Sequence, residues 1–246
     1  MKADPQAQRR LLDLQAIDTT LAQLAHRRRT LPEHAELEEL DRKVSALEDE
    51  RVQAQVTVDD LDRDIARMEG DIEQVRVRKD RNEARLMQGT GPARELEALQ
   101  HELTSLNRRQ RDLEDAELEL MEQRENEQRV LDDVEARLAE ARDQRAAAVT
   151  RRDQALADIA KEEEFRLSAR KPLVADLPAD LIALYDQVRE ASGGLAAALL
   201  SGGRCGGCRL ELAGVDRARI KAAAPDEVVR CEECRRILVR TAESGL

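Results

Sequence analysis

The sequence predicts an all-α, extended antiparallel coiled-coil hairpin followed by a small, β-rich C-terminal module. Charged residues make up 38% of the 246 residues and aromatic residues only 1%, which is too little bulk for one ordinary globular core. Apolar residues recur with a heptad period on both sides of a glycine-containing segment, as in paired helices. Four cysteines gather near the C-terminus. Most residues are therefore expected to lie in long helices, and the most specific functional motif is expected near the C-terminus.

A first helical segment is expected over residues 4–31, where Leu14, Leu21 and Leu24 recur at helical spacing. Pro32 interrupts it, because the residue before a proline is pushed out of the helical region and a proline suits the first turn of a new helix. We therefore expect a bend near residue 32.

A strict heptad follows for about fifty residues, a strong signal of a coiled coil. It ends at Gly89-Thr90-Gly91-Pro92, which is expected to be the tip of the hairpin. A phosphate-binding loop is not expected there, because no apolar strand precedes the glycines and no Lys-Ser/Thr follows them. The two seam positions before the tip hold Leu37, Val44, Arg51, Val58, Ile65, Ile72, Lys79 and Leu86, and Leu40, Leu47, Ala54, Leu61, Met68, Val75 and Asn82.

A second long helix resumes the apolar repeat and runs back to Pro172. Its length matches the first arm, so residues 1–171 are expected to fold as an antiparallel hairpin. Leucines are densest just after the tip, and we expect the tip to be the best-packed part of the coil and the middle to be thinner. Its apolar positions are Leu96, Leu99, Leu103, Leu106, Leu113, Leu120, Leu131, Val134, Leu138 and Ile159.

Residues 172–203 read as a linker that carries a short docking helix. The helix spans Asp180 to Glu190, with Leu181, Leu184, Tyr185 and Val188 on one face. The composition of Ala196 to Leu200 does not decide between a small strand and a further helical turn.

The cysteines predict a metal site in residues 204–246. Cys205 and Cys208 form one Cys-x-x-Cys pair and Cys231 and Cys234 form a second, close to the spacing of a closed four-cysteine zinc site. Two disulfides are the alternative, but the N-terminus has no signal-peptide pattern and export is not expected. A redox dithiol would not need two copies. We therefore predict a C4 zinc ribbon with one structural Zn²⁺.

Secondary structure in this ribbon is expected to be short. Arg209 to Leu212 alternates as a strand, Asp216 to Ala223 is expected to be a helix that Pro225 stops, and Ile237 to Val239 is expected to be the last strand. Such a module has few core residues, so zinc should supply much of its folding free energy.

Charge and composition favour two classes of function and disfavour a third. The preferred hypothesis is an adaptor that binds a protein partner and has no small-molecule substrate. The alternative is RNA or DNA binding through the ribbon. Residues 195–246 hold nine basic and seven acidic residues, so nonspecific nucleic-acid binding has only a small basic excess to rest on.

An enzyme is not expected, because no catalytic constellation is recognisable. No apolar stretch is long enough for a membrane span, and a cytoplasmic location is expected. The candidate nucleic-acid contacts are Arg204, Arg209, Arg217, Arg219, Lys221, Arg230, Arg235, Arg236 and Arg240.

The sequence resembles a bacterial family of coiled-coil proteins with a C-terminal C4-type zinc ribbon. The resemblance is carried by residues 94–102 after the tip, by Leu181 to Val188, and by the two cysteine pairs with their neighbours. Members are described as nucleic-acid-binding proteins or regulators, and relatives in flagellated or type III secreting bacteria are implicated in binding an alternative sigma factor. The resemblance therefore implies an adaptor. Arg235 stands where the family usually has glycine.

Overall fold

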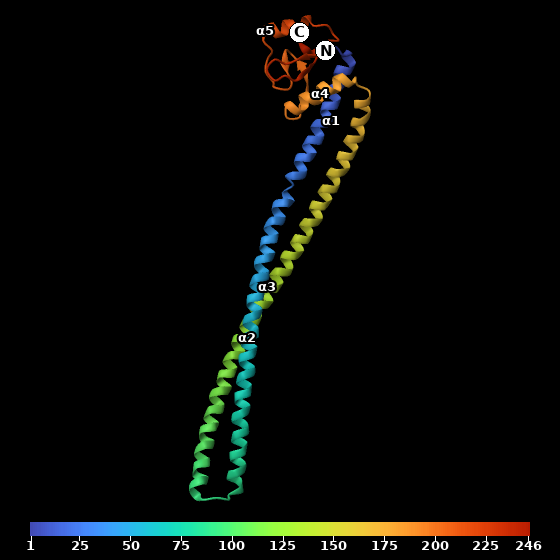
Figure 1. Ribbon diagram of the computed structural model, residues 1–246. Coiled ribbons are helices and arrows are strands. Elements are labelled where there is room, and N and C mark those ends of the chain that lie inside the picture. The colour runs from blue at the N-terminus through green and yellow to red at the C-terminus, as the bar shows by residue number, and fades with distance from the viewer. The chain divides into compact units, whose positions relative to one another are not determined.

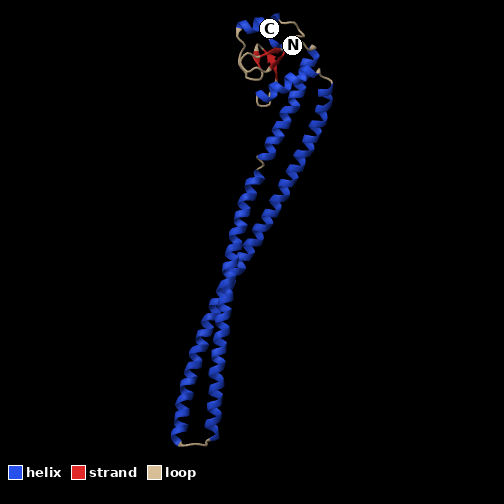
Figure 2. Ribbon diagram, viewed as in Figure 1, coloured by secondary structure: helices blue, strands red, loops and turns tan.

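The computed structural model describes residues 1–246 as an almost wholly helical chain with one small sheet (Figures 1 and 2). None of its helices is both long and apolar enough to cross a lipid bilayer. The helices are α1 (Pro5–Arg29), α2 (Pro32–Gln88), α3 (Ala93–Ala175), α4 (Ala179–Ala191) and α5 (Gly214–Ala222), followed by the short 3-10 helix η1 (Ala242–Ser244). The strands are β1 (Ala197–Ser201), β2 (Arg204–Cys205), β3 (Val229–Arg230) and β4 (Ile237–Val239).

One compact unit consists of residues 35–149. Within it, α2 and α3 lie side by side and run in opposite directions from the loop at residues 89–92 (Figure 1). This is the predicted antiparallel hairpin. Its apolar seam is buried in three successive clusters: Leu37, Leu40 and Ala148; Leu47, Leu138 and Ala141; and Ala54, Val58 and Leu131.

The prediction that the tip is the best-packed part of the coil is wrong. The leucines nearest the tip on α3 remain only half-buried, whereas the buried clusters lie farther from it. The reason is that α2 contributes Lys79 and Asn82 to this part of the seam, and Lys79 Nζ donates a hydrogen bond to Gln110 Oε1 at 3.1 Å. Apolar spacing in one helix buries its side chains only where the facing helix is also apolar. The half-buried leucines are Leu96, Leu99, Leu103 and Leu106.

The other unit consists of residues 1–34 and 150–246. Here Leu24 of α1 and Leu31, in the break after α1, pack against Ile159 of α3. The chain breaks between α1 and α2 as predicted, with Pro32 as the first residue of α2, where its missing N–H costs no helical hydrogen bond. At the other end α3 differs from the prediction. It continues past Pro172 to Ala175, although the proline removes one helical hydrogen bond, and it ends three residues later.

A four-stranded sheet, in the order β2-β1-β4-β3, supports the C-terminal region. Strand β1 pairs in parallel with β4, with Ala197 opposite Ile237, and the other two pairings are antiparallel. Residues 197–200 therefore form a strand, the first of the two possibilities that the composition left open for residues 196–200. This strand lies inside the segment assigned to the linker. Residues 209–212 differ from the prediction, because only Glu211 forms an isolated bridge, with Arg204.

The largest apolar core of this unit joins α1 to the sheet. Its buried side chains come from α1, α4, β1 and β4, so the sheet does not fold around its own residues alone. Tyr185 and Leu181 of α4 are fully buried in it. The other members are Ala3, Leu11, Leu14, Leu177, Val188, Ala196, Ala197, Ile237 and Val239.

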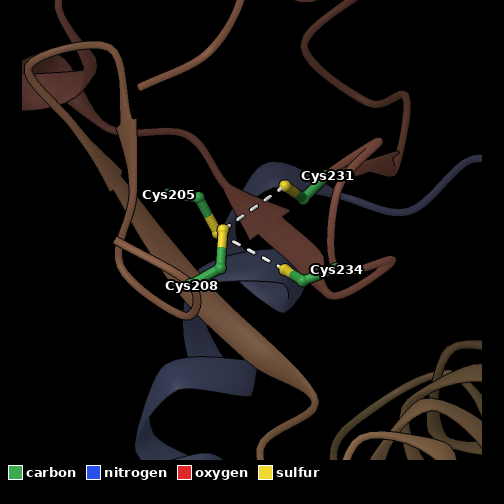
Figure 3. A group of neighbouring side chains, drawn as sticks. All are labelled: Cys205, Cys208, Cys231 and Cys234. Atoms are coloured by element: carbon green, nitrogen blue, oxygen red, sulfur yellow. Dashed lines mark hydrogen bonds between the residues drawn. The ribbon is translucent and has the colours of Figure 1, made fainter. Parts of the chain in front are cut away.

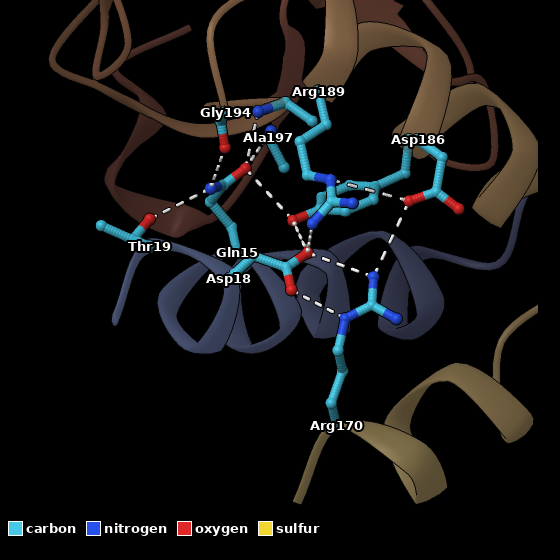
Figure 4. A network of polar contacts seen from close by, with 10 residues as sticks. Gln15, Asp18, Thr19, Arg170, Asp186, Arg189, Gly194 and Ala197 are labelled. Atoms are coloured by element: carbon cyan, nitrogen blue, oxygen red, sulfur yellow. Dashed lines mark hydrogen bonds and ion pairs between the residues drawn. The ribbon is translucent and has the colours of Figure 1, made fainter. Parts of the chain in front are cut away.

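A buried carboxylate ties α1, α3 and α4 together (Figure 4). The Asp18 side chain is 1% exposed and accepts hydrogen bonds from Arg170 Nε at 2.7 Å and from the Tyr185 hydroxyl at 2.9 Å. Arg189 Nη1 lies 3.2 Å from Asp18 Oδ2, the oxygen that also accepts from Tyr185. Burial and the neighbouring Asp18 charge raise the pKa of Tyr185, so the phenol stays protonated and donates. Two arginines and one phenol thus compensate the cost of burying this charge.

Gln15, one turn before Asp18, connects the same helix to the sheet (Figure 4). Its Oε1 accepts from the backbone N–H groups of Ala196 at 2.6 Å and Ala197 at 3.1 Å. Its Nε2 donates to the carbonyl of Gly194 at 2.9 Å and to Thr19 Oγ1 at 3.1 Å. The amide therefore satisfies the backbone where β1 begins, which an apolar side chain would leave unpaired.

Candidate metal centre

Two equivalent turns present the cysteines. In the first turn, the Arg209 N–H donates to the carbonyl of Cys205 at 2.7 Å, and in the second the Arg235 N–H donates to the carbonyl of Cys231 at 2.9 Å. Both arginines directly follow a Cys-x-x-Cys pair and both are left-handed, with φ of 64° and 61°. The left-handed residue closes each turn and directs the two thiols of a pair to one side. Glycine adopts this conformation most readily, and this chain has arginine at both positions.

The four sulfur atoms converge on one point (Figure 3). All four lie within 4.8 Å of one another, with Cys205 Sγ 3.8 Å from Cys234 Sγ and Cys208 Sγ 3.9 Å from Cys231 Sγ. Four thiolates at the usual Zn–S distance of about 2.3 Å define a tetrahedron with edges of about 3.8 Å. A disulfide would need a separation of about 2 Å. The sulfur positions therefore fit a tetrahedral zinc ion.

The electrostatics of the thiols also fit a cation. Burial raises the pKa of Cys205 to about 12, although backbone N–H groups of Cys208 and Gly207 favour its thiolate, and burial likewise raises the pKa of Cys231. Burial disfavours the Cys234 thiolate too, but hydrogen bonds from the Arg236 backbone and from neighbouring groups outweigh it and lower the pKa to about 7. Buried thiols that resist ionisation alone become ligands once a metal ion compensates their charge.

Close packing explains the two glycines of the first turn. A Cβ atom at Gly206 would lie 2.8 Å from the carbonyl oxygen of Leu199 in β1, to which the Gly206 N–H donates a hydrogen bond. A Cβ at Gly207 would lie 2.6 Å from Cδ of Arg236. The first turn therefore rests directly on the sheet, and larger residues would push it away.

Two of the candidate nucleic-acid contacts are instead parts of the scaffold. Arg236 donates from Nε to the Leu195 carbonyl at 2.8 Å and from Nη2 to the Ser192 carbonyl at 3.2 Å. Arg240 holds the segment after α5 by donating to five carbonyl groups, those of Ile220, Ala223, Ala224, Pro225 and Glu227. The Arg236 guanidinium therefore joins the ribbon to the linker before it, and the Arg240 guanidinium is used within the ribbon.

Most of the remaining basic side chains also have partners in the ribbon. Arg204 and Arg217 lie beside Glu211, while Arg219 and Arg235 lie beside Glu232. Arg230 Nε donates to the Arg235 carbonyl at 2.6 Å. Of the nine candidates, Arg209 and Lys221 alone have no such partner. The structure does not gather the nine into one free basic face.

Several residues that hold the site in place escape sequence reasoning. The Ala3 N–H donates to the Asp226 carbonyl at 2.7 Å, and the Val228 N–H donates to the Met1 carbonyl at 3.1 Å. Lys2 Nζ lies 3.0 Å from Asp226 Oδ2. No motif marks the first three residues. The nearest signal for this unit is the pair Gln15 and Asp18, polar residues within an otherwise apolar helical face.

The match to known families agrees with this geometry. Residues 14–193 match the CT398-like coiled coil hairpin domain, and residues 204–238 match the C4-type zinc ribbon domain. The chain belongs to the CT398-like coiled-coil hairpin family. The ribbon match and the four-sulfur cluster together support one structural zinc ion. Four cysteine ligands leave that ion no open position for a catalytic water.

Relatives of this CT398-like chain share its full length. An uncharacterized protein of Mycobacterium tuberculosis is 42% identical over 240 residues, which is 98% of both chains. A solved structure from Mycobacterium smegmatis has a TM-score of 0.85 at 38% identity and covers 98% of this chain and 100% of its own. The structure of CT398 from Chlamydia trachomatis has a TM-score of 0.65 at 20% identity, covering 95% of this chain and 97% of that one, and this likeness concerns the fold.

Proposed function

We propose that this protein is a non-enzymatic adaptor of the cytoplasm, whose helical hairpin binds a protein partner and whose zinc ribbon is a rigid structural end. The observation that carries the proposal is the apolar surface left on the coil. Two helices alone do not cover their own apolar side chains, and such exposed groups favour protein contacts. Between 45% and 59% of the residue is exposed at Val52, Val56, Val77, Leu118, Met121 and Val130, and 91% at Met87.

The ribbon favours this function over nucleic-acid binding. Seven of its nine basic side chains have partners within the ribbon or the linker before it, and the ribbon contains no aromatic residue on which bases could stack. A structural zinc ion and paired arginines suit a stable module better than a phosphate-binding face.

The test is recovery of a partner. The chain is captured from its native cytoplasm at low salt, with and without nuclease, and any protein recovered is purified and titrated against the isolated chain. A protein that survives nuclease and rebinds with a micromolar or lower Kd is expected. Recovery of nucleic acid alone, lost when Cys231 is replaced by serine, would assign the function to the ribbon and overturn the proposal.

A further inference from the structure

The tip segment, defined as residues 76–111, is a basic region in an acidic chain. It contains nine Arg and Lys residues and five Asp and Glu residues, a net charge of +4, whereas the whole chain has a net charge of −11. All of these residues belong to one compact unit, on α2 and α3 beside the loop. The positive charge is therefore concentrated on a defined part of the hairpin.

The cations of the tip segment are mostly unpaired. Arg78 Nε lies 2.8 Å from Glu102 Oε1, but no other basic side chain of the segment has a carboxylate within 4.0 Å. Farther along the coil, interhelical pairs such as Arg142 with Glu48 occupy the guanidinium groups. Unpaired guanidinium groups are free to meet carboxylates or phosphates from outside.

Three arginines of the tip segment line one groove of about 700 Å³ beside α2, and two of them, Arg81 and Arg85, have no carboxylate partner. Arg78, Arg81 and Arg85 recur at steps of three and four, so they form a stripe about 10 Å long on one helical face. Val77, 58% exposed, adds apolar surface. Asn82 is 5% exposed, and its Nδ2 donor is buried without a partner. The remaining lining residues are Glu73, Gln74 and Glu102.

We propose that this groove, the tip groove, binds an acidic amphipathic helix of a partner protein. The carboxylates of that helix meet Arg81 and Arg85, and its apolar stripe covers Val77 and the half-buried seam leucines of the tip segment. A third helix would complete a core that two helices leave partly open. This assignment rests on the proposed adaptor function and names its surface and the chemistry of its partner.

Charge complementarity favours an acidic helix over a nucleic acid. Glu73 and Glu102 also line the groove, and the chain outside the tip segment carries a net charge of −15. A polyanion meets this repulsion along its length, whereas a short helix meets only the groove. The tip segment also contains no aromatic residue, so it offers bases no stacking platform.

A lipid surface fits the groove less well. Arg78 stands eleven residues before Gly89 along the sequence, which in a helix is about 16 Å. That distance exceeds the Debye length of about 8 Å at physiological salt. A membrane that touched the loop would therefore gain little from the arginine stripe, while a helix that lies along α2 reaches all of it.

The test uses the full chain and a labelled peptide probe of about 20 residues with leucine at the two seam positions and glutamate elsewhere. We expect a Kd below about 0.1 mM by fluorescence anisotropy, weakening as salt rises. The double variant Arg81→Gln/Arg85→Gln should weaken binding about tenfold or more. The matched control is Arg27→Gln/Arg29→Gln, which removes two exposed α1 arginines that also have no carboxylate partner, and it should leave the Kd unchanged.

Four outcomes would overturn the assignment. The first is no binding of the acidic peptide, and the second is equal binding of a peptide with lysine in place of glutamate. The third is tighter, variant-sensitive binding of a single-stranded oligonucleotide, which would assign the groove to phosphodiesters. The fourth is a dimer that the double variant dissociates in sedimentation, which would make the occupant a second copy of this chain.

The variant also separates this proposal from the adaptor function itself. If the double variant still captures the partner protein recovered from the cytoplasm, that partner binds elsewhere on the hairpin. The tip-groove assignment then fails and the adaptor function stands. If the wild-type chain recovers no protein, the adaptor function fails first.

Discussion

Two regions of the molecule differ in whether their buried polar and charged side chains have partners. In the unit that contains the ribbon, the buried carboxylate of Asp18 has three partners and the amide of Gln15 has five. In the tip segment, the buried Asn82 Nδ2 has none, and Arg81 and Arg85 have no carboxylate nearby. Buried polar groups whose hydrogen bonds are satisfied specify one arrangement. Polar groups without partners can still form hydrogen bonds or ion pairs with an external ligand. The first region therefore suits a fixed structure, and the second suits the binding role that we propose for the tip groove.

The largest effect is expected from removing one metal ligand. Cys231→Ser should release the zinc ion, because three thiolates cannot close the site, with a loss of about 10 kcal/mol in folding free energy for the ribbon. Zinc release measured with a chromogenic chelator checks this, and Glu233→Ser in the same turn is the control. Circular dichroism should retain most of the helical signal. A global loss of helix would show that the helical hairpin depends on the ribbon.

Equivalent leucine truncations compare the two cores directly. Leu14→Ala removes a side chain that is fully buried in the core of α1 and the sheet, and it should cost about 3 kcal/mol. Leu103→Ala, at a half-buried seam position, should cost about 1 kcal/mol because less apolar area is lost. Denaturant unfolding of both variants gives the two values. Equal losses would contradict the contrast between the regions.

Removal of the buried charge tests the polar network. Asp18→Ala leaves Arg170 and Arg189 without their shared carboxylate, and because these arginines are 24% and 40% exposed, the cost should be about 2 to 3 kcal/mol, below that of a fully buried pair. Thermal unfolding checks it. Asp186→Ala, which removes a half-exposed carboxylate beside the same arginines, should change stability by less than about 1 kcal/mol.

The smallest expected effect has the opposite sign. Asn82→Leu places an apolar side chain in the seam of the tip segment and removes a buried donor without a partner, so it should stabilise the hairpin by about 1 kcal/mol. Denaturant unfolding measures the gain, and Asn107→Leu, at an exposed position on α3, is the control. A loss of stability would mean that Asn82 is satisfied in solution.

Sequence patterns predicted what local spacing encodes. The heptads identify the hairpin, Pro32 marks a helix boundary, and the two cysteine pairs identify the zinc ribbon because their ligand spacing is short and specific. Packing density was not predictable in the same way. The leucines after Gly91 suggested a tight tip, but their burial depends on Lys79 and Asn82, which lie on the other helix.

Long-range partners also escaped the sequence. Strand β1 consists of two alanines, two leucines and one serine, a composition also suited to a helix. Its pairing with β2 and β4 and its contact with Gln15 make it a strand. The roles of Arg236 and Arg240 as donors to backbone carbonyls were hidden for the same reason. A basic residue near a metal site looks like a ligand-binding group until its acceptors are known.

The core shared by α1 and β4 sets an order for folding during synthesis. Leu11 and Ile237 pack in one core although more than two hundred residues separate them. Residues 35–149 can pair while the ribosome is still producing the ribbon, since their contacts are made within that stretch. The apolar face of α1 has no sheet to cover it until β4 has emerged. Early pairing of α2 with α3 shortens the effective loop that must close, and so lowers the entropic cost of bringing β4 to α1.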